Sequence, residues 1–281
     1  MNPATFQYLA GIVKQRSGGV LTADQGYMLD TRLAPLLKRE GMATLDALAM
    51  KLRTPGGEKL AQEMTELLTT NESHFFRDGK PFDHLKALLP DLHRARAPGV
   101  PIRIWSAACS TGQEAYSIAI LLAEAQEVGD SSLKARRFEV VGTDLTTAVL
   151  DRAREAVFTQ FEVQRGLQIR QLMKHFTQIE TRWRAKDHLR AYTKFQQANL
   201  LSDLRSFGKF DVIFCRNVLI YFDMPTKSRV LGGIAGQLAG DGALYLGAAE
   251  TALGITDRLE PILGQRAIYR PASSEAVRAR A

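Results

Sequence analysis

From Ile102 onward, short apolar runs alternate with helical segments along the chain. The runs IRIWSAA, FEVVGTD, FDVIFCRN and GALYLGAAE are short, apolar and rich in β-branched or aromatic residues. Helix-like segments separate them, namely EAYSIAILLAEAQE, TAVLDRARE and KSRVLGGIAGQLA. Strands that alternate with helices predict a parallel sheet covered by helices on both faces. We therefore expect residues 91–281 to form an α/β domain.

The first 90 or so residues predict helices only. The segments FQYLAGIVKQ, GYMLDTRLAPLLKRE, TLDALAMKL and EKLAQEMTELL place apolar residues at three-to-four spacing. Glycine and proline mark the joins between them. The run HRARAPGVP (93–101) is a candidate linker. We expect a helical domain over residues 1–90.

One stretch interrupts the alternation. Residues 176–183 and 190–196 predict two or three short antiparallel strands, so we expect a small β-subdomain inserted at about 165–197. The chain has a net charge of +7 and a pI near 9.5. Residues 165–196 carry eight basic and two acidic side chains, a local charge of +6. This segment is either a solvated basic face or a docking patch for an acidic partner.

The composition narrows the class of protein. The chain of 281 residues is 45% hydrophobic and has no run of eighteen apolar residues, so no membrane insertion is expected. The opening lacks the pattern of a signal peptide. Two cysteines, Cys109 and Cys215, make no disulfide framework, and no Cys/His cluster has the spacing of a zinc site. We expect a cytoplasmic protein without a metal.

The strand ends carry the candidate ligand contacts, because an open parallel sheet binds ligands outside the carboxyl ends of its strands. SAACSTGQE (106–114) is rich in small residues and leads into a helix whose N-terminus favours anions or acceptors. Asp144 ends the next strand, and its two carboxylate oxygens suit the hydroxyls of a ribose, in a nicotinamide cofactor or in S-adenosylmethionine. The alternative role for Asp144 is to cap the following helix. The triplet ANL (198–200) and the pair RN (216–217) follow later strands.

A further segment, TTNESHFFRD (69–78), is too rich in functional side chains for an ordinary connection. Together with RIWSAACSTGQEAYSIAI, VVGTDL, ANL, FDVIFCRNVLIYFD and GALYLGAAET, it closely resembles the chemotaxis receptor glutamate O-methyltransferases, the CheR family. The resemblance covers about residues 5–270. It implies a class I, Rossmann-like methyltransferase domain with an antiparallel β-subdomain, preceded by an all-α domain. It also implies transfer of a methyl group from S-adenosylmethionine to receptor glutamates, giving γ-glutamyl methyl esters and S-adenosylhomocysteine.

The resemblance assigns roles residue by residue. The cofactor contacts that it implies are Asn71, Ser73, Arg77, Glu114, Asp144, Asn199, Leu200, Arg216 and Asn217. At Ser73 the family often has Thr, and the hydroxyl is kept. Arg77 can pair with the carboxylate of the cofactor or of the substrate glutamate. We expect Arg77 and Tyr221 to be the catalytic residues, as orienting groups. No general base is expected, because a glutamate is already ionised at neutral pH.

The remaining expectations concern His74, the opening segment and the partners. His74 is expected to be a packed, hydrogen-bonded residue, and Phe75 and Phe76 are expected to anchor a lid in a domain interface. Arg182, Arg184 and Lys186 are expected to dock the helical cytoplasmic domain of a chemoreceptor. Some family members also bind a C-terminal receptor pentapeptide at a glycine-containing loop. Here WRAKDHLR, interpreted as that loop, has no glycine, so we expect no such tether, and we expect a monomer.

Competing hypotheses remain at the level of sequence. A nucleic-acid methyltransferase is supported by the pI and by the basic insertion, but no aromatic stacking surface accompanies the charge. A non-catalytic cofactor-binding scaffold is a second alternative, against which the full set of site residues argues. A nicotinamide-dependent dehydrogenase is a third, and the glycine fingerprint that it needs is absent.

Overall fold

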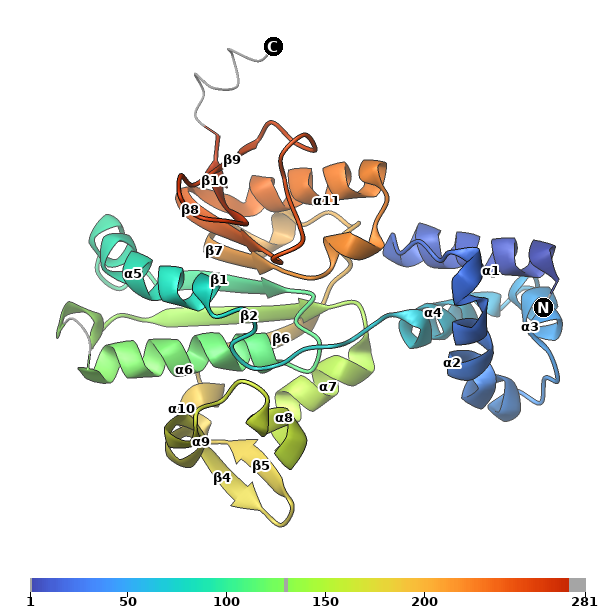
Figure 1. Cartoon of the computed structure of the whole chain (residues 1–281), viewed down its shortest axis with the longest axis horizontal. Coiled ribbons are helices and arrows are strands. Elements are labelled where there is room, and N and C mark those ends of the chain that lie inside the picture. Colours follow the sequence, from blue (N-terminus) through green and yellow to red (C-terminus); the bar gives the residue numbers. More distant parts are fainter. Residues whose placement is uncertain (1, 129–130, 273–281) are drawn as a thin grey trace. The chain divides into compact units, whose positions relative to one another are not determined.

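The computed structural model describes residues 2–128 and 131–272 (Figure 1). Two compact units are distinguished. One holds the chain up to Thr70 together with Tyr221–Arg229, and the other holds Asn71–Ile220 and the chain from Val230 onward. The division thus falls earlier than the expected boundary near residue 90. The reason is that helix α5 (Lys80–Ala95) buries its apolar face in the core of the second unit.

The first unit is helical. Its elements are α1 (Pro3–Ser17), the short 3₁₀ helix η1 (Ala23–Gln25), α2 (Gly26–Arg39), α3 (Leu45–Leu52) and α4 (Gly57–Leu68). Asn2 caps α1 by accepting the N–H of Ala4, and Gly18 ends it in the left-handed region. Leucines at helical spacing on α1, α2 and α3 meet Met64 of α4 in one core. The segment after η4 (Leu219–Tyr221) belongs here because Phe222 pairs with Gly19.

The second unit is built on a mixed sheet. Over the described residues it has seven strands in the order β6-β2-β1-β7-β8-β10-β9. Their bounds are β1 (Ile102–Ala107), β2 (Phe138–Asp144), β6 (Thr193–Gln197), β7 (Phe210–Cys215), β8 (Leu238–Leu246), β9 (Leu259–Pro261) and β10 (Ile268–Pro271). The first five in this order are parallel, and β10 and β9 are antiparallel additions at one edge. The expected α/β fold is confirmed.

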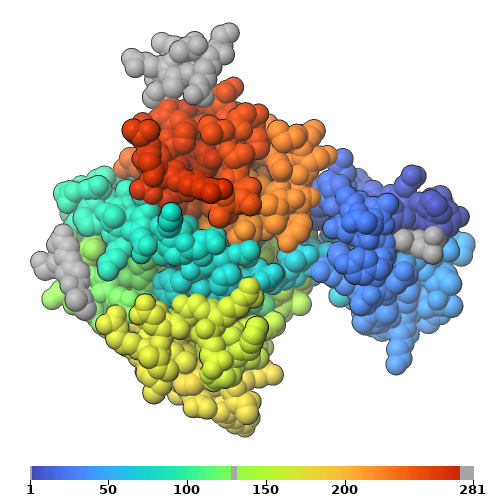
Figure 2. All heavy atoms as spheres, viewed as in Figure 1, coloured from blue at the N-terminus to red at the C-terminus, as the bar shows by residue number. Residues whose placement is uncertain are grey.

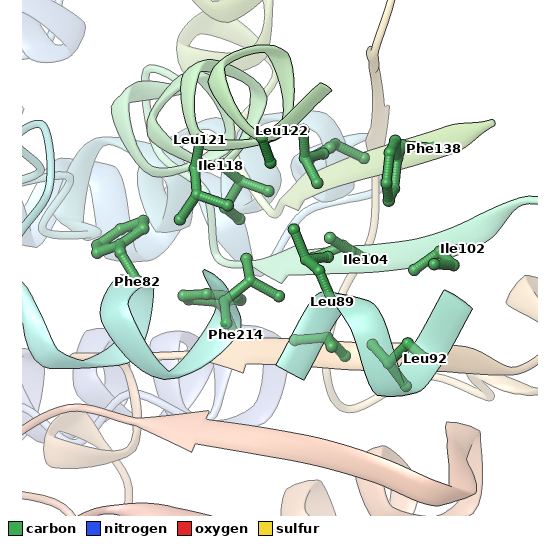
Figure 3. Close-up of a cluster of buried hydrophobic side chains, with 14 of the residues drawn as sticks. Phe82, Leu89, Leu92, Ile102, Ile104, Ile118, Leu121, Leu122, Phe138 and Phe214 are labelled. Carbon is green, nitrogen blue, oxygen red and sulfur yellow. The ribbon is translucent and has the colours of Figure 1, made fainter. Parts of the chain in front are cut away.

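One face of this sheet is covered by α5 and α6 (Gln113–Val128). Figure 3 shows Leu89 and Leu92 of α5 beside Ile104 and Ile102 of β1 in the buried cluster. Residues of β1 alternate between the faces, so Trp105 points the other way and stacks on Phe210 and Phe207. Strand β1 therefore buries apolar side chains on both of its faces.

The crossovers place further helices. The chain runs from β1 through α6 to β2 in one direction along the sheet, and from β7 through α11 (Met224–Gln237) to β8 in the other. Right-handed crossovers in opposite directions put their helices on opposite faces. Helix α7 (Thr147–Glu155) joins β2 to the small subdomain and packs against β6 and β2. Short 3₁₀ helices η2 (Ser131–Leu133) and η3 (Arg205–Phe207) complete the connections.

The inserted subdomain is a three-stranded antiparallel sheet in the order β3-β5-β4. Its strands are β3 (Val157–Thr159), β5 (Arg182–Ala185) and β4 (Phe176–Ile179), with helices α8 (Gln160–Gln164), α9 (Ile169–His175) and α10 (Asp187–Arg190). Figure 2 shows it in yellow-green to yellow as a surface lobe of the α/β unit. The prediction of a small antiparallel β-subdomain inserted in the α/β domain is thus confirmed.

Two details of that prediction were wrong. Residues 193–197 form β6 of the large sheet, parallel to β2, rather than a strand of the subdomain. The strand is mostly polar and lies at the sheet edge, so its sequence resembles an exposed antiparallel strand. In turn, WRAKDHLR is not a loop, because it contains most of β5 and all of α10. The connection between β4 and β5 is instead the pair Glu180-Thr181.

No helix within the described ranges has the length and apolar character needed to cross a membrane.

Candidate active site

The strand order reverses between β1 and β7. From β1 the chain continues to β2 on one side of this point, and from β7 it continues to β8 on the other side. Ligands of open α/β sheets bind at such a reversal, outside the carboxyl ends of the strands. The loop after β1 and the turn after β7 therefore flank the expected binding site. Of the predicted set, Arg216 and Asn217 lie in the turn after β7, and Glu114 lies in the first turn of α6, directly after the loop that follows β1.

The loop after β1 has a tightly wound backbone. Ala108, Ser110 and Gly112 all have positive φ, of 56°, 52° and 93°. The N–H of Cys109 donates to the carbonyl of Thr143 (2.9 Å), and the N–H of Ser110 donates to the Asp144 carboxylate (2.8 Å). The loop is thus fixed against the end of β2 at a cost in backbone strain, which is typical of functional sites.

Asp144 is buried at 5% exposure, and its carboxylate organises the site. One oxygen accepts the Ser110 N–H, and the other accepts the Thr146 N–H at 3.0 Å, ahead of α7. The alternative role in shaping the start of the helix is therefore realised in part. Each carboxylate oxygen accepts more than one hydrogen bond, so these contacts are compatible with ribose binding.

The segment from Asn71 to Asp78 belongs to the α/β unit. The Asn71 carbonyl accepts the Ser110 hydroxyl (2.8 Å), and the Phe76 N–H donates to the Ser117 hydroxyl (2.9 Å). Phe75 is fully buried, with its ring 5.0 Å from that of Phe158 in the small subdomain. The expectation that Phe75 anchors a lid in a domain interface was wrong, because its apolar partners lie within this unit.

Gly166, between α8 and α9, makes a close approach to the same segment. A Cβ on Gly166 would lie 1.9 Å from the Phe75 carbonyl oxygen, and its φ is +106°. Arg165 beside it pairs with Glu72 at 2.7 Å. The small subdomain is thus packed directly on the backbone of the predicted cofactor segment.

Arg216 connects three parts of the site. Its side chain is 2% exposed. One terminal nitrogen donates to Glu114 (2.9 Å), and the other donates to Asp78 (2.6 Å) and to the Arg77 carbonyl (2.8 Å). Glu114 also accepts the Ser106 hydroxyl at 2.7 Å. Since both terminal nitrogens are used within the protein, Arg216 positions its neighbours. Its buried Nε makes no hydrogen bond to any described residue.

A small polar pocket, the switch-point pocket, lies beside this cluster. Its lining residues are Glu72, Ser73, His74, Arg77, Ala108, Glu114, Arg216 and Asn217. The structure thus brings together five predicted residues, Ser73, Arg77, Glu114, Arg216 and Asn217. Asn71 and Asp144 contact the loop after β1, as described above.

The other predicted residues lie elsewhere. Asn199 and Leu200 follow β6, and Asn199 accepts the N–H of Leu201 (2.9 Å). Ala198 connects this turn to the site, since its N–H donates to the Asp144 carbonyl at 2.9 Å. Tyr221 is 39% exposed and belongs to the segment grouped with the helical unit, where its carbonyl accepts the N–H of Val20.

Sequence reasoning missed the role of Glu250. This side chain is 7% exposed, and it accepts the N–H groups of Asn217 (2.8 Å), Ile220 (3.2 Å) and Gly247 (2.7 Å). An acidic residue shortly after a strand was the available signal, as at Asp144. Asp78, the second carboxylate on Arg216, was also missed.

His74 lines the pocket, and its buried Nδ1 makes no hydrogen bond to any described residue. The expected hydrogen bond is thus not found at that nitrogen. Burial lowers the pKa of the His74 imidazole, and the positive charges of Arg165 and Arg77 lower it further. The ring is therefore neutral at pH 7.

The carboxyl edge of the sheet is acidic. Burial raises the pKa of the Cys109 thiol, and Asp144 and Glu114 add to the effect. Burial and the charges of Glu250 and Glu114 do the same to the pKa of Cys215. Both thiols are thus protonated and inert. The carboxylates of Asp144, Glu114 and Glu250 make the electrostatic potential at the thiols negative. Such an edge fits a ligand that carries a positive charge. Within the described ranges, no group of three or more His, Cys, Asp or Glu side chains is arranged to hold a metal ion.

Comparison with known families identifies the family of this chain. Residues 71–268 match the family model described as CheR methyltransferase, SAM binding domain, and residues 4–69 match CheR methyltransferase, all-alpha domain. The chain belongs to the CheR methyltransferase family. It is an S-adenosylmethionine-dependent methyltransferase of chemotaxis.

Family relatives are similar over nearly their whole length. The chain is 36% identical over 261 residues to chemotaxis protein methyltransferase 1 of Pseudomonas aeruginosa, covering 92% of this chain and 94% of that protein. It is 33% identical to chemotaxis protein methyltransferase Cher2 of Pseudomonas putida, with the same coverage. Identity to chemotaxis protein methyltransferase 1 of Vibrio cholerae is 34%, over 89% of this chain and 90% of that protein.

The chemical character of the residues around the switch-point pocket suits S-adenosylmethionine, the cofactor of the CheR family. S-adenosylmethionine supplies a methyl group on a positively charged sulfonium, attached to a nucleoside and to an amino acid. The acidic strand ends suit the positive charge, and the buried Arg216 Nε is an unused donor beside the pocket. The small residues of the loop after β1 would let a ligand approach the backbone closely.

Proposed function

We propose that the protein methylates glutamate side chains of a chemoreceptor, giving γ-glutamyl methyl esters and S-adenosylhomocysteine. The observation that carries the proposal is the switch-point pocket, where five predicted residues from three separate motifs line one polar cavity. The proposal places the reaction in the cytoplasm, on the helical cytoplasmic domain of the receptor, with the enzyme acting as a monomer.

The cofactor contacts follow from the positions of the strand ends. Asp144 binds the ribose hydroxyls through its carboxylate oxygens. The turn at Asn199 and Leu200 presents polar groups to the adenine edge. Asn71, Ser73, Glu114 and Asn217 surround the remainder of the cofactor. Arg216 contributes chiefly by fixing Glu114 and the backbone at Arg77, because those contacts already occupy its terminal nitrogens.

The chemistry requires orientation more than proton transfer. A free glutamate has a pKa of about 4.3, so the nucleophile is an anion before it binds. Its carboxylate oxygen forms the new bond to the methyl carbon as the bond to sulfur breaks, and no proton is moved. Arg77 orients the substrate carboxylate so that attack is in line. Tyr221 remains the second orienting residue predicted from the sequence. His74 is neutral and is not needed as a base.

Receptor docking is proposed for the exposed face of β5. Arg182 and Arg184 alternate with the buried Trp183 and are both exposed on the same face of the small sheet. Among the described residues, no carboxylate lies within ion-pair distance of either. Lys186 differs, because its ammonium donates to the Lys174 carbonyl (2.7 Å) at the end of α9. The proposed docking patch is therefore Arg182 and Arg184.

Most of the remaining positive charge of residues 165–196 is paired with acidic side chains. The pairs are Arg165 with Glu72, Lys174 with Glu127, Arg190 with Asp187, and Lys194 with Glu139. A paired surface binds the nucleic-acid backbone weakly, since such binding depends on unpaired cations that displace counterions. This favours a receptor over a nucleic acid as the partner.

No pentapeptide tether is proposed, because the Glu180-Thr181 connection between β4 and β5 has no glycine.

The test is incubation with radiolabelled S-adenosylmethionine and a receptor cytoplasmic fragment. Label should enter the fragment and be released as methanol in alkali, as carboxyl methyl esters require. A fragment with its candidate glutamates changed to alanine is the control, and a second fragment without its C-terminal tail should be labelled equally. Alkali-stable label, or label entering RNA instead, would contradict the proposal.

A further inference from the structure

Glu250 is a buried carboxylate whose charge is met by backbone amides. It accepts three N–H groups, from Asn217, Ile220 and Gly247, at 2.7 to 3.2 Å. Within the described part of the chain, no Lys, Arg or His lies within ion-pair distance of it. A buried charge held only by amides is costly unless every bond is well made. The side chain therefore requires the turn after β7 to keep one conformation.

Asn217 lies in that turn with a φ of +59°, in the left-handed region. Residues with a Cβ adopt this conformation less readily than glycine does, and asparagine is among those that tolerate it best. The contacts around Asn217 select this conformation from those open to asparagine. The two bonds from Asn217 and Ile220 to Glu250 bracket the turn and supply that restraint.

Gly247 allows the contact from the side of β8. A Cβ at this position would lie 2.7 Å from the Glu250 carboxylate and 2.8 Å from the Asn217 side-chain amide. Only glycine lets the end of β8 approach this closely. Gly247, Glu250 and Asn217 thus form one packed unit beside the switch-point pocket.

We propose that Glu250 is a positioning residue for cofactor binding, acting by holding Asn217 in the wall of the switch-point pocket. The two residues after β7 are then fixed from opposite directions. Arg216 is fixed by Glu114 and Asp78, and Asn217 is fixed by Glu250. The inference concerns cofactor affinity, so it does not depend on which protein accepts the methyl group.

The test is the variant Glu250→Gln, with S-adenosylhomocysteine binding measured by calorimetry at a temperature where the variant is folded. The dissociation constant should rise about tenfold, because the amide replaces an acceptor with a donor facing backbone N–H groups. The matched control is Glu260→Gln, which removes a carboxylate paired with Arg270 on the surface of the same unit and should bind normally. Normal binding by folded Glu250→Gln would overturn the proposal, even if its melting temperature fell.

A double-mutant cycle tests the route through Asn217. In an Asn217→Ala background, Glu250→Gln should weaken binding by much less than tenfold, since the side chain to be positioned is gone. Fully additive effects would overturn the proposal. If Glu250→Gln does not fold, Gly247→Ala is the second test. It should also weaken binding about tenfold, and unchanged affinity would overturn the proposal.

Discussion

Arg216 and Glu114 form a buried ion pair, 2.9 Å long, that joins the end of β7 to the first turn of α6. The Arg216 side chain is 2% exposed and that of Glu114 is 12% exposed. The pair spans the reversal of strand order, so the two loops that flank the pocket are held by one contact. Breaking this ion pair should therefore loosen both loops.

Replacing Arg216 by methionine should destabilise the protein by about 3–5 kcal/mol, because Glu114 is left as an unpaired buried charge. Urea denaturation measures the loss. The double variant Arg216→Met with Glu114→Gln should recover part of it, since the stranded charge is removed. A double variant no more stable than the single one would show that the charge is not the cause.

Replacing Arg77 by alanine distinguishes its two possible partners. If Arg77 orients the substrate glutamate, turnover at saturating cofactor and substrate should fall about 100-fold while S-adenosylhomocysteine binds normally. If it pairs with the cofactor, affinity for the cofactor should fall instead. Arg77→Lys keeps the positive charge but loses the planar guanidinium with its paired donors. Its turnover or cofactor affinity should therefore lie between that of Arg77→Ala and that of the unchanged protein. Normal turnover and affinity in Arg77→Ala would remove it from the site.

Gly166 should be irreplaceable, because a Cβ there would lie 1.9 Å from the Phe75 carbonyl. The matched control is Gly99, which also has positive φ (+81°) but has open space around the Cβ position. Gly99→Ala should cost about 1 kcal/mol from backbone strain alone. Gly166→Ala should cost about 2 kcal/mol more in urea denaturation, from overpacking. Equal losses in the two variants would argue against the close approach.

The stability of the protein should fall as the pH drops below neutrality. His175 is fully buried, and its Nδ1 lies 2.9 Å from Nε2 of His188. Burial lowers the pKa of both imidazoles. Below the ordinary histidine pKa of about 6.5 the unfolded chain therefore binds protons that the folded chain does not, and unfolding becomes easier.

The charged groups around this histidine pair act in both directions. Glu124 opposes the lowering of the His175 pKa and Lys174 adds to it, while Glu127 and Asp187 oppose and Lys186 adds at His188. Urea denaturation between pH 7.5 and 5.5 should show the loss of stability, and His188→Gln should reduce its steepness. An unchanged slope would mean that other groups carry the effect.

Charge reversal at Arg182 and Arg184 should raise the Michaelis constant for the receptor more than it lowers turnover. The reason is that steering by complementary charge acts on the encounter, and it should weaken as salt is added. Arg266→Glu, at an exposed position between β9 and β10, is the net-charge control for each single reversal, Arg182→Glu or Arg184→Glu, because all three change the net charge by the same amount. Equal effects of the two changes would indicate a general charge effect and no docking patch.

Local sequence patterns determine much of the secondary structure and the general fold of this protein. Helical spacing predicted the N-terminal unit, and the alternation of apolar runs with helices predicted the parallel sheet. The strand ends marked Glu114, Asp144, Arg216 and Asn217 as site candidates, since strand direction alone brings those ends to one edge.

The tertiary structure decided what depends on contacts between distant segments. The polar strand β6 joins the large sheet because β2 offers a free edge, and α5 joins the α/β unit because the sheet buries its leucines. Phe75 packs on the small subdomain, and Glu250 reaches back to the turn after β7. Neither partner is near in sequence, so no local pattern could indicate which apolar surface or which amide each side chain would meet.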